Sequence, residues 1–363
     1  MIRILHVLGG LNRGGAESMI MNLYRKIDRN SFQFDFIIHT NGDQDFSSEV
    51  IELGGKIFVF PKFNGKNYRE LKTKWSEFFK AHPEYKILHS HVRSYASLYI
   101  PIAKKNNVKT IIHSHSTSNG KGFKSLVKKA LQYPLRFQAD RFIGCSEASG
   151  KWLFGSRIIK SEKYSTLQNA ITLENFVNDP VRRSILRDKL KISGKCYIHV
   201  GRLHPAKNHG FLLDCFARIV SDDPQAVLLI VGDGECKDEI KKKIDELGIG
   251  ESVRMLGSRA DVPELLLAAD VFLFPSIWEG VPLTVVEAQA AGLPCIVSDR
   301  VTEDVCVSEL VTRLPISDPT VWAKNANSIT PYRIDVRNMI SDAGYDVKQN
   351  AVLLEKYYLE LVD

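Results

Sequence analysis

Residues 271–297 read VFLFPSIWEGVPLTVVEAQAAGLPCIV, and this stretch predicts a strand, a loop, a helix and a second strand in turn. The two apolar runs, Val271–Phe274 and Cys295–Val297, are typical of strands buried on both faces of a parallel sheet. Pro282 fits the first turn of the intervening helix, where its missing N–H costs nothing, and Gly292 fits the helix end. A strand, a helix and a parallel strand form the repeating unit of a doubly wound α/β fold.

The same alternation of short β-branched runs and amphipathic stretches of helical length recurs along the chain. The strands predicted in the first half are Arg3–Leu8, Phe34–Ile38, Lys56–Val59, Ile87–Ser90, Thr110–His113, Arg141–Cys145 and Tyr164–Leu167. Those predicted in the second half are Tyr197–Val200, Ala226–Val231, Val253–Leu256, Val271–Phe274 and Cys295–Val297. Because the pattern starts again near the middle, we expect two doubly wound, Rossmann-like domains.

The length of 363 residues also suits two domains, at about 150 residues each. We predict a first domain over residues 1–180 and a second over 181–340. The last stretch, 341–363, reads as a helix that docks on either domain, and one alternative is that it crosses back to the first. With 44% hydrophobic and 25% charged residues, a disordered or fibrous chain is excluded. The formal net charge of +7 suits anionic ligands or an anionic surface.

The cysteines and the apolar runs bear on localisation. The 6 cysteines are widely spaced and form no C-x-x-C pair or Cys/His cluster at metal-ligand spacing, which favours a reducing compartment. The first residues, MIRILHVLGGL, are too short an apolar run for a signal peptide. No stretch approaches the ~18 to 20 apolar residues that span a bilayer. We therefore expect a cytoplasmic protein, at most peripheral on the inner face of the cell membrane.

Ligands of doubly wound sheets bind beyond the carboxyl ends of the strands, so the residues directly after strands are the candidates. Gly14 and Gly15 follow the first strand, where free N–H groups can bind an anion, although an ordinary strand-to-helix turn explains them equally well. Their surroundings do not match G-x-G-x-x-G, and G-x-x-x-x-G-K-[ST] is absent. Dehydrogenase and P-loop functions therefore lose their main support.

Charged residues follow two predicted strands of the second half. Arg202 and Lys207 share one loop, where two cations can grip a diphosphate, although each alone is more often a solvated surface residue. Glu279 lies in the loop after Val271–Phe274. Glu287 is the acidic residue of an otherwise apolar helix, where it can present acceptor oxygens to hydroxyl groups. An ordinary surface glutamate fits this helix poorly.

Glu279 and Glu287 resemble the E-x7-E motif of retaining glycosyltransferases with the GT-B fold, in the large family 4 that uses nucleotide sugars. Gly201-Arg202, Lys207-Asn208, Gly232–Glu235, Val253–Gly257 and Ala268–Val271 occur in the order and spacing of that family. Gly14–Glu17 and Ile112–His115 extend the resemblance to the first domain. The resemblance is closest to bacterial enzymes that build capsular or exopolysaccharide repeat units. It implies two Rossmann-like domains facing a central cleft, the domain over residues 1–180 on the acceptor side and the domain over 181–340 binding the nucleotide sugar.

The resemblance also implies roles for individual residues. The implied donor-binding residues are Gly14, Gly15, Arg202, Lys207, Arg254, Met255, Leu256, Gly280, Val281, Pro282, Leu283 and Glu287. Glu287 would hold the donor ribose, Arg202 and Lys207 would neutralise the diphosphate, and residues 254–256 would lie against the base through their backbone. The implied catalytic residues are Glu279, at the donor sugar, and His115, beside the transferred sugar. His113 is the alternative to His115, because HSHS allows either ring to point into the cleft.

The resemblance implies no metal and no cofactor, because the two cations and a helix dipole take the place of an ion. Asp43 and Asp45 formally match the D-x-D of metal-dependent glycosyltransferases of the other major fold. That fold lacks the second α/β half in which the cations and the two glutamates lie, so we discount the match.

Residues 121–141 combine basic and apolar residues at a rough helical period. The basic ones are Lys121, Lys124, Lys128, Lys129, Arg136 and Arg141. Such a segment can lie on an anionic membrane, and an ordinary surface helix packed on the first domain has equal weight. The basic residues show no recognised nucleic-acid fold, so no nucleic-acid partner is predicted.

The leading hypothesis is therefore a retaining hexosyl- or N-acetylhexosaminyltransferase of capsule or exopolysaccharide synthesis. It would move a sugar from a nucleotide diphosphate donor, with a UDP-sugar favoured, to a hydroxyl of a lipid-linked saccharide or polysaccharide. Two alternatives stay open. One is a nucleotide-sugar-binding partner subunit that has lost catalysis, and the other is a nucleotide-sugar epimerase of similar architecture.

Overall fold

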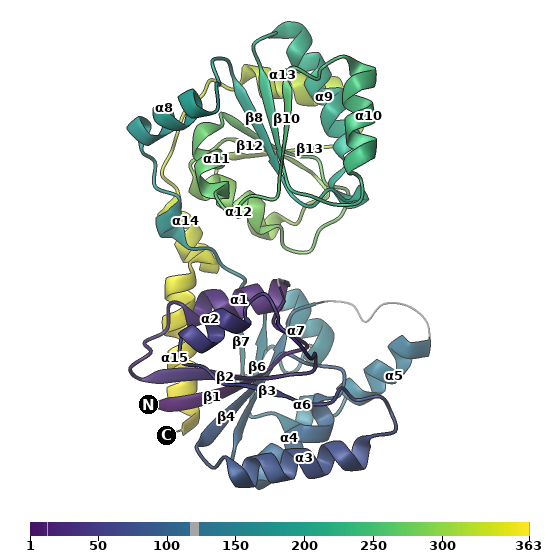
Figure 1. Cartoon of the computed structure of the whole chain (residues 1–363), viewed down its shortest axis with the longest axis vertical. Helices are drawn as coiled ribbons and strands as arrows, with labels where there is room; N and C mark the ends of the chain where they lie inside the picture. Colours follow the sequence, from purple (N-terminus) through teal and green to yellow (C-terminus); the bar gives the residue numbers. More distant parts are fainter. Residues whose placement is uncertain (13, 117–122, 363) are drawn as a thin grey trace. The chain divides into compact units, whose positions relative to one another are not determined.

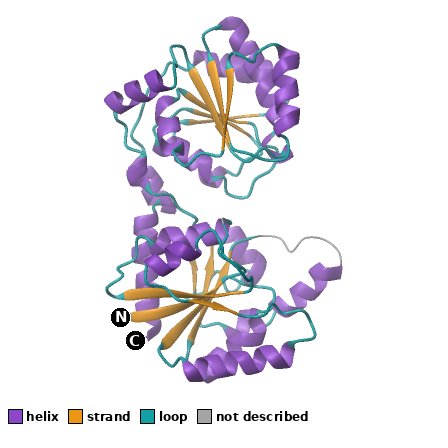
Figure 2. Cartoon of the chain, viewed as in Figure 1, coloured by secondary structure: helices purple, strands orange, loops and turns teal. Residues whose placement is uncertain are grey.

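The computed structural model describes residues 1–12, 14–116 and 123–362 and divides the chain into two compact α/β units. Unit 1 contains Met1–Ala170 together with Val347–Asp363, and unit 2 contains Ile171–Asp346. Each unit has a parallel sheet with helices on both faces (Figures 1 and 2), which confirms the predicted fold class.

The sheet of unit 1 has 7 strands in the order β3-β2-β1-β4-β5-β6-β7, all parallel. Its strands are β1 (Ile2–Val7), β2 (Phe32–Ile38), β3 (Ile57–Val59), β4 (Tyr85–Ser90), β5 (Lys109–Ser114), β6 (Arg141–Gly144) and β7 (Tyr164–Thr166). Its helices are α1 (Gly15–Tyr24), α2 (Ser47–Glu52), α3 (Tyr68–Ala81), α4 (Ala96–Lys105), α5 (Phe123–Gln132), α6 (Leu135–Gln138), α7 (Glu147–Phe154) and α15 (Val347–Val362). One apolar core joins the sheet to α1, α2 and α15, and a second joins it to α3, α4, α6 and α7.

The sheet of unit 2 has 6 parallel strands in the order β10-β9-β8-β11-β12-β13. Its strands are β8 (Cys196–Val200), β9 (Val227–Val231), β10 (Val253–Gly257), β11 (Val271–Phe274), β12 (Cys295–Ser298) and β13 (Val311–Leu314). Its helices are η1 (Leu173–Asn175), α8 (Pro180–Lys189), η2 (Pro205–Lys207), α9 (His209–Asp222), α10 (Lys237–Leu247), α11 (Val262–Ala268), α12 (Leu283–Ala290), η3 (Glu303–Val305), α13 (Pro319–Ser328), α14 (Arg337–Ile340) and η4 (Ser341–Tyr345). Helices α9, α10 and α13 share one core, and α11, α12 and α14 share the other.

The division between the units differs from the predicted boundaries. It falls after Ala170 rather than after residue 180, because the Ile171 N–H donates to the Tyr345 carbonyl at 2.9 Å and Phe176 is buried in the unit 2 core. The predicted helix over 341–363 is interrupted at Gly344, whose φ of +86° is incompatible with a continuous helix. Only the part from Val347 onward, α15, belongs to unit 1.

Helix α15 is fixed to unit 1 by polar as well as apolar contacts. The fully buried Tyr358 hydroxyl lies 2.9 Å from His89 Nδ1, and Arg141 Nη2 donates to Glu360 at 2.6 Å. In Figure 1 this helix, in yellow, lies beside the strands that begin the chain. The end of the sequence therefore completes the core of unit 1.

One strand was not predicted. β13 (Val311–Leu314) lies at the edge of the unit 2 sheet, where Thr312 and Arg313 interrupt the apolar residues. Val311 and Leu314 pack against the two cores, but the strand lacks the continuous apolar run by which the other strands were predicted, so that pattern misses it.

Candidate functional site

The loops that follow β8 and β11 lie side by side in unit 2. The two strands pair in parallel, so the residues beyond their carboxyl ends leave the same edge of the sheet. The Ile277 N–H joins the loops by donating to the Ala206 carbonyl at 2.7 Å. Lys207 and Glu279 meet there, with the Lys207 Nζ 2.7 Å from Glu279 Oε1 and each side chain 14% exposed. The structure thus brings together two residues that were predicted separately.

Lys207 is held more tightly than Arg202. Its Nζ lies 4.5 Å from the centroid of the Phe274 ring, a cation–π distance. A Cβ on Gly201 would lie 2.9 Å from Lys207 Cε, so a glycine makes room for this side chain. Arg202 is 69% exposed and pairs with Glu235 at 3.1 Å, a surface contact that contributes little to stability. The loop after β8 therefore offers one fixed cation and one that can reorient toward a ligand.

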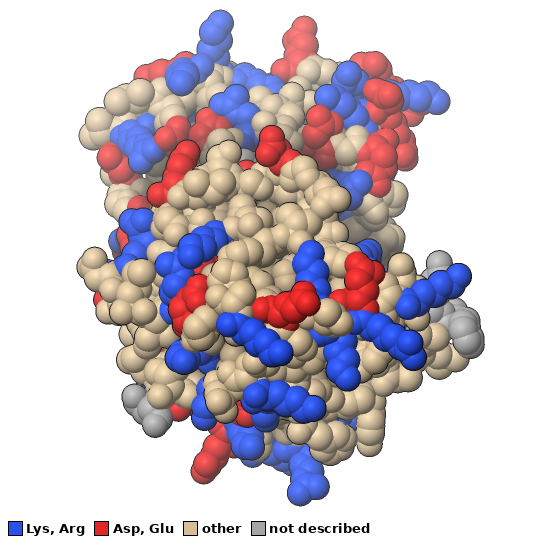
Figure 3. Space-filling view, turned by 60° about the horizontal axis from the view of Figure 1, so that its bottom comes forward, with Lys and Arg blue, Asp and Glu red and all other residues tan. Residues whose placement is uncertain are grey.

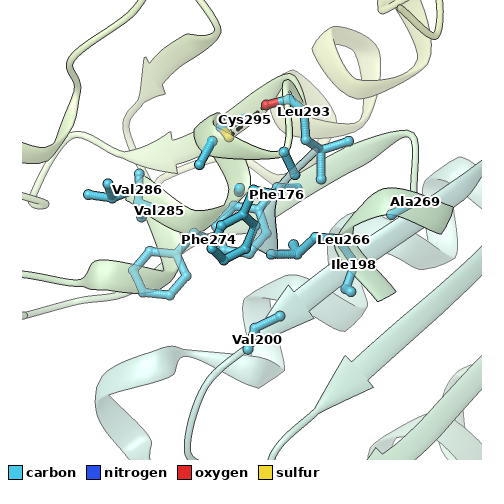
Figure 4. Close-up of a cluster of buried hydrophobic side chains, with 14 of the residues drawn as sticks. Phe176, Ile198, Val200, Leu266, Ala269, Phe274, Val285, Val286, Leu293 and Cys295 are labelled. Carbon is cyan, nitrogen blue, oxygen red and sulfur yellow. Dashed lines mark hydrogen bonds between the residues drawn. The ribbon is translucent and has the colours of Figure 1, made fainter. Parts of the chain in front are cut away.

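Helix α12 is anchored on its apolar side. Val285 and Val286 pack into the core shown in Figure 4 with Phe274 and Ile198. The buried Gln289 side chain donates to the Val305 carbonyl at 2.7 Å. These contacts set the rotation of the helix.

Glu287 is presented by this anchored helix. Its side chain is partly exposed, and within the described residues its carboxylate has no hydrogen-bond partner or ion pair. Burial raises the pKa of Glu287 to about 7. The carboxylate therefore has free acceptor oxygens, as recognition of hydroxyl groups requires.

The residues before α12 form its amino end. Pro282 is the N-cap with an extended backbone, and the helix begins at Leu283, one residue later than predicted. The first N–H groups of a helix have no partner within the helix and favour an anion. Thr284 adds a buried Oγ1 that has no hydrogen-bond partner in the part of the chain that the structure describes, and a Cβ on Gly280 would meet nothing described within 4 Å. Val281 packs against the core.

The residues predicted to face the base lie on β10. Arg254 donates to the carbonyls of Leu190 and Lys191, the second at 3.1 Å, and both precede β8. The Arg254 guanidinium is therefore bound to residues that precede the amino end of β8, whereas Arg202 and Lys207 follow the carboxyl end of that strand. Met255 and Leu256 pack against the cores on opposite faces of the sheet. All three side chains are partly exposed, and contact of a base with the backbone of residues 254–256 stays a prediction.

In unit 1, Gly14 is the N-cap of α1 and Gly15 its first residue, so the helix begins within the predicted loop. A Cβ on Gly15 would meet nothing within 4 Å, whereas a Cβ on Gly14 would collide with the Glu17 carboxylate. A carboxylate of the chain itself therefore lies at the amino end of α1, and anion binding by Gly14 and Gly15 stays a prediction.

Five histidines gather at β1, β4 and β5, which are neighbours in the unit 1 sheet. His6, His89 and His113 lie on these strands, and His91 and His115 directly follow β4 and β5. His115 Nε2 lies 2.8 Å from His91 Nδ1, and His91 Nε2 lies 3.0 Å from His6 Nδ1. His113 is fully buried, and neither of its ring nitrogens has a hydrogen-bond partner among the described residues, whereas His115 is partly exposed. Burial and the nearby Arg93 charge lower the pKa of His115 to about 3. His115 is therefore a neutral ring whose orientation is fixed by a chain of two further histidines.

His91 was not predicted as a site residue, yet a signal was present. The triplet HSH occurs twice, at residues 89–91 and 113–115. β4 and β5 pair in parallel, so the two triplets lie side by side at the carboxyl ends of the strands. A repeated polar triplet at the ends of two adjacent apolar runs is unusual for a purely structural strand.

Among the described residues, two histidine groups could hold a metal ion. In His6, His89 and His91, and in His91, His113 and His115, one ring nitrogen from each residue lies within 4.8 Å of the others. Both ring nitrogens of His91 are occupied by contacts to other histidines. An ion in either group would have to displace one of these contacts. In the described part of the chain, the exposed Asp43 and Asp45 belong to no such group.

The basic segment over 121–141 is not one helix. It comprises α5, the short α6 and the start of β6, and Arg141 is turned to α15, 4.4 Å from the Tyr357 ring centroid. Lys121 and the side chain of Lys124 lie outside the described residues. The exposed apolar side chains of α5 and its flank are Leu126, Val127, Tyr133 and Phe137. Lys128 and Lys129 are exposed on α5, and Figure 3 shows further Lys and Arg side chains on the surface of unit 1.

Comparison with known proteins defines the class. The family model described as Glycosyl transferases group 1 matches residues 183–338, and that of Glycosyltransferase Family 4 matches residues 13–175. EpsF of Bacillus subtilis (strain 168), which is named as a glycosyltransferase, is 35% identical over 373 residues, 98% of this chain and 96% of EpsF.

A second relative is the UDP-Gal:alpha-D-GlcNAc-diphosphoundecaprenol alpha-1,3-galactosyltransferase of Escherichia coli. It is 30% identical over 314 residues, 82% of this chain and 79% of its own length. The crystal structure of Anabaena HepE in complex with UDP has the same fold, with a TM-score of 0.77 at 20% identity over 99% of this chain and 100% of HepE. The fold is GT-B. The chain belongs to glycosyltransferase family 4 and is a glycosyltransferase.

Proposed function

We propose that this glycosyltransferase moves a hexosyl or N-acetylhexosaminyl group from a UDP-sugar to a hydroxyl of a lipid-linked saccharide, with retention of anomeric configuration and without a metal ion. The observation that carries the proposal is the Lys207–Glu279 pair at 2.7 Å on the same unit as the unpaired carboxylate of Glu287. The Escherichia coli relative, whose name specifies a UDP-Gal donor and a diphosphoundecaprenol-linked acceptor, supports both substrate classes. We place the reaction in capsule or exopolysaccharide assembly.

In this proposal unit 2 holds the donor. The ribose hydroxyls donate to the free carboxylate oxygens of Glu287 on α12. Lys207 and Arg202 contact the diphosphate, and the amino end of α12 adds a partial positive charge. Charge that develops on the departing UDP is thereby stabilised by groups already in place, which is usually the largest contribution to such catalysis.

The transfer breaks the bond between the sugar C1 and the β-phosphate oxygen and forms a bond between C1 and the acceptor oxygen. The acceptor proton passes to the departing phosphate on the same face, so UDP leaves and the anomeric configuration is retained. Glu279 orients Lys207 and contacts the sugar. His115, neutral and hydrogen-bonded to His91, contacts the transferred sugar without adding a charge.

We further propose a peripheral site on the cytoplasmic membrane face. Each helix in the described residues is too short or too polar to cross a bilayer. The exposed apolar residues and lysines of α5 fit an anionic lipid surface, where basic residues are attracted to the headgroups.

The test is an assay of the purified protein with a panel of nucleotide sugars and a synthetic saccharide linked to a short polyprenyl diphosphate. Transfer with release of UDP supports the proposal. Binding of UDP without transfer or hydrolysis would instead identify a partner subunit that has lost catalysis. Isomerisation of the donor without an acceptor would identify an epimerase.

The location of the donor site is tested by calorimetry with UDP. We expect Lys207→Ala and Glu287→Ala to weaken binding by about tenfold or more, because a charge-assisted hydrogen bond contributes about 1.5–3 kcal/mol. Lys242→Ala, on the exposed face of α10, is the matched control. Unchanged affinity in both site variants, with the fold intact, would remove the donor from this site.

A further inference from the structure

The rings of His91, His113 and His115 lie against one another at the carboxyl ends of β4 and β5. Their centroids are 5.3 Å apart for His91 and His113, 5.0 Å for His91 and His115, and 4.1 Å for His113 and His115. Residues two apart in a strand leave the same face, which brings the two rings of the second triplet together. The hydroxyl of the intervening Ser114 instead donates to the Ser149 carbonyl on α7 at 2.9 Å.

Several ring nitrogens of this group lack partners. Neither nitrogen of His113 nor Nδ1 of His115 has a hydrogen-bond partner among the described residues, although all three atoms are buried. A neutral imidazole carries one donor and one acceptor, so His113 leaves both unsatisfied. Buried polar atoms without partners are rare in folded proteins and cost stability, and a bound ion is one explanation for them. The unpaired nitrogens are thus a second observation, besides the proximity of the rings, that points to a ligand.

The group can be reached from solvent at two of its residues. His115 is partly exposed, and His91 lines an open cavity of about 330 Å³. His6 and His89, which form the other candidate group together with His91, are both fully buried. An ion can therefore approach the rings of His91 and His115 from outside, whereas two of the three rings in the other group are closed off. Because the two groups share His91, we expect one ion per chain.

The ligand set defines the kind of ion. Three imidazoles without a carboxylate suit a transition-metal ion such as Zn²⁺ rather than Mg²⁺ or Ca²⁺, which prefer oxygen ligands. Nitrogen atoms on one tetrahedral zinc ion lie about 3.3 Å apart, because each is ~2.0–2.1 Å from the metal. His91 Nδ1 and His115 Nε2 are 2.8 Å apart, so a small separation of the rings lets an ion replace their hydrogen bond. His6, 3.0 Å from the other nitrogen of His91, fixes the orientation of that ring, as partners of metal-bound histidines usually do.

The Arg93 guanidinium opposes a cation at this place, because its positive charge acts on the His115 ring. Arg93 donates to the Ser116 carbonyl at 3.1 Å and lies 5.1 Å from the centroid of the Trp152 ring, and these contacts hold the charge in place. Repulsion between like charges weakens the binding of a metal ion. Such a site suits an ion that binds and is released rather than one that is required for folding.

We propose that His91, His113 and His115 bind one divalent transition-metal ion of the zinc type, and that this ion inhibits transfer. The inhibitory role rests on the proposed function, in which His115 contacts the transferred sugar. A His115 ring that is bound to a metal ion is not free to make that contact, and the added positive charge lies next to the transferred sugar. The reaction itself uses no metal, so removal of the ion restores activity.

The first experiment titrates Zn²⁺ into the untagged full chain without nucleotide and follows binding by calorimetry. We expect one ion per chain. His113→Asn and His115→Asn should each weaken binding about tenfold or more, because loss of a residue that merely orients a metal ligand already costs about 10- to 100-fold. Circular dichroism checks the fold of each variant, and His115→Asn, at a partly exposed position, keeps the test available where His113→Asn does not fold.

Three further variants are measured in the same way. His82→Asn removes a histidine that belongs to neither group and is the matched control. His89→Asn removes a ligand of the other group only and should keep the wild-type Kd for Zn²⁺. Arg93→Gln should tighten binding about threefold, because it removes a repelling charge. Mg²⁺ should not bind the wild-type protein at the same concentrations.

The second experiment measures transfer by chelator-treated protein at controlled concentrations of free Zn²⁺. We expect saturating Zn²⁺ to lower kcat about tenfold or more, excess EDTA to restore it, and the Kd for UDP to stay unchanged. His113→Asn should need about tenfold more Zn²⁺ for half-maximal inhibition, since it lacks one of the three ligands.

The outcomes separate the parts of the inference. Zn²⁺ that does not bind, or that binds His113→Asn and His115→Asn as tightly as the wild type and is then an adventitious ion only, would overturn the site. Weaker binding in His89→Asn alone would place the ion in the buried group and overturn the assignment. Undiminished transfer by the zinc-saturated protein would overturn the inhibitory role. Absence of transfer by the zinc-free wild type would overturn the proposed function instead and would leave the Zn²⁺ titration unaffected.

Discussion

Glu287 offers a test of the donor site that does not depend on the identity of the sugar. Replacing it by Gln keeps the size of the side chain and removes the ionisable group. The folded-state pKa of Glu287 is about 7, against an ordinary value of 4.5, because burial disfavours the charged form. The folded protein therefore holds this proton more tightly than the unfolded chain does.

The sign of the effect follows from proton linkage. Well below pH 4.5 the carboxyl is protonated in both states, so burial carries no charge penalty. Between about pH 4.5 and 7 the folded state loses stability as the pH rises. The rise in pKa from 4.5 to about 7 corresponds to about 3 kcal/mol. We expect Glu287→Gln to be more stable than the wild type by about 1 kcal/mol at pH 5.5 and by about 3 kcal/mol at pH 8.

Urea unfolding, followed by circular dichroism at these two pH values, measures the difference in the free energy of unfolding between Glu287→Gln and the wild type. Glu251→Gln, at an exposed position, is the control and should show no such dependence on pH. UDP at 100 times its Kd should stabilise the wild-type protein by about 2.7 kcal/mol and the Gln variant by less, because the variant lacks the carboxylate that accepts the ribose hydroxyls. Equal urea midpoints for variant and wild type at both pH values would show that the carboxylate is not desolvated, and the reasoning would fail.

Three other results are expected. His115→Ala should keep the Kd for UDP and lower kcat about 100-fold, as loss of one positioned polar group does. His113→Ala should instead lower the free energy of unfolding by about 2 kcal/mol. The reverse pattern would assign the catalytic role to His113. Lys128→Glu combined with Lys129→Glu should weaken co-sedimentation with anionic vesicles about 30-fold at low salt, and equal sedimentation would leave α5 an ordinary surface helix. Transfer should survive excess EDTA, and activity that vanished and returned with Mn²⁺, Mg²⁺ or Zn²⁺ would replace the cation mechanism by a metal site.

The sequence predicted the strands that carry the site because each is a short, mostly apolar run. Val271–Phe274 was predicted with its observed bounds, and the pairing of β11 with β8 then places Lys207 beside Glu279. The contact between Lys207 and Glu279 could not be derived from their spacing in the sequence. It depends on strand order, which is set by crossover connections rather than by local pattern.

Strand order also explains what was missed in unit 1. His6 lies far from His91 in the sequence, and the two meet because β1 pairs with β4. Helix α15 packs on unit 1 through Tyr358, whose hydroxyl contacts His89. The sequence pattern does not distinguish Tyr358 from other aromatic residues, because the contact joins two distant segments of the chain. Local patterns predict which residues are buried, and long-range pairing decides which buried residues meet.

The groups of unit 2 that lack partners near α12 point to a ligand rich in hydroxyl groups. Among the described residues, the Glu287 carboxylate has no hydrogen-bond partner, and the buried Thr284 Oγ1 has none either. Lys207, the cation held in the loop after β8, is already paired with Glu279. A sugar hydroxyl donates the hydrogen bond that the Glu287 oxygens lack. Because the unpaired carboxylate lowers the stability of the empty protein, UDP should stabilise the wild-type chain more than the Glu287→Gln variant.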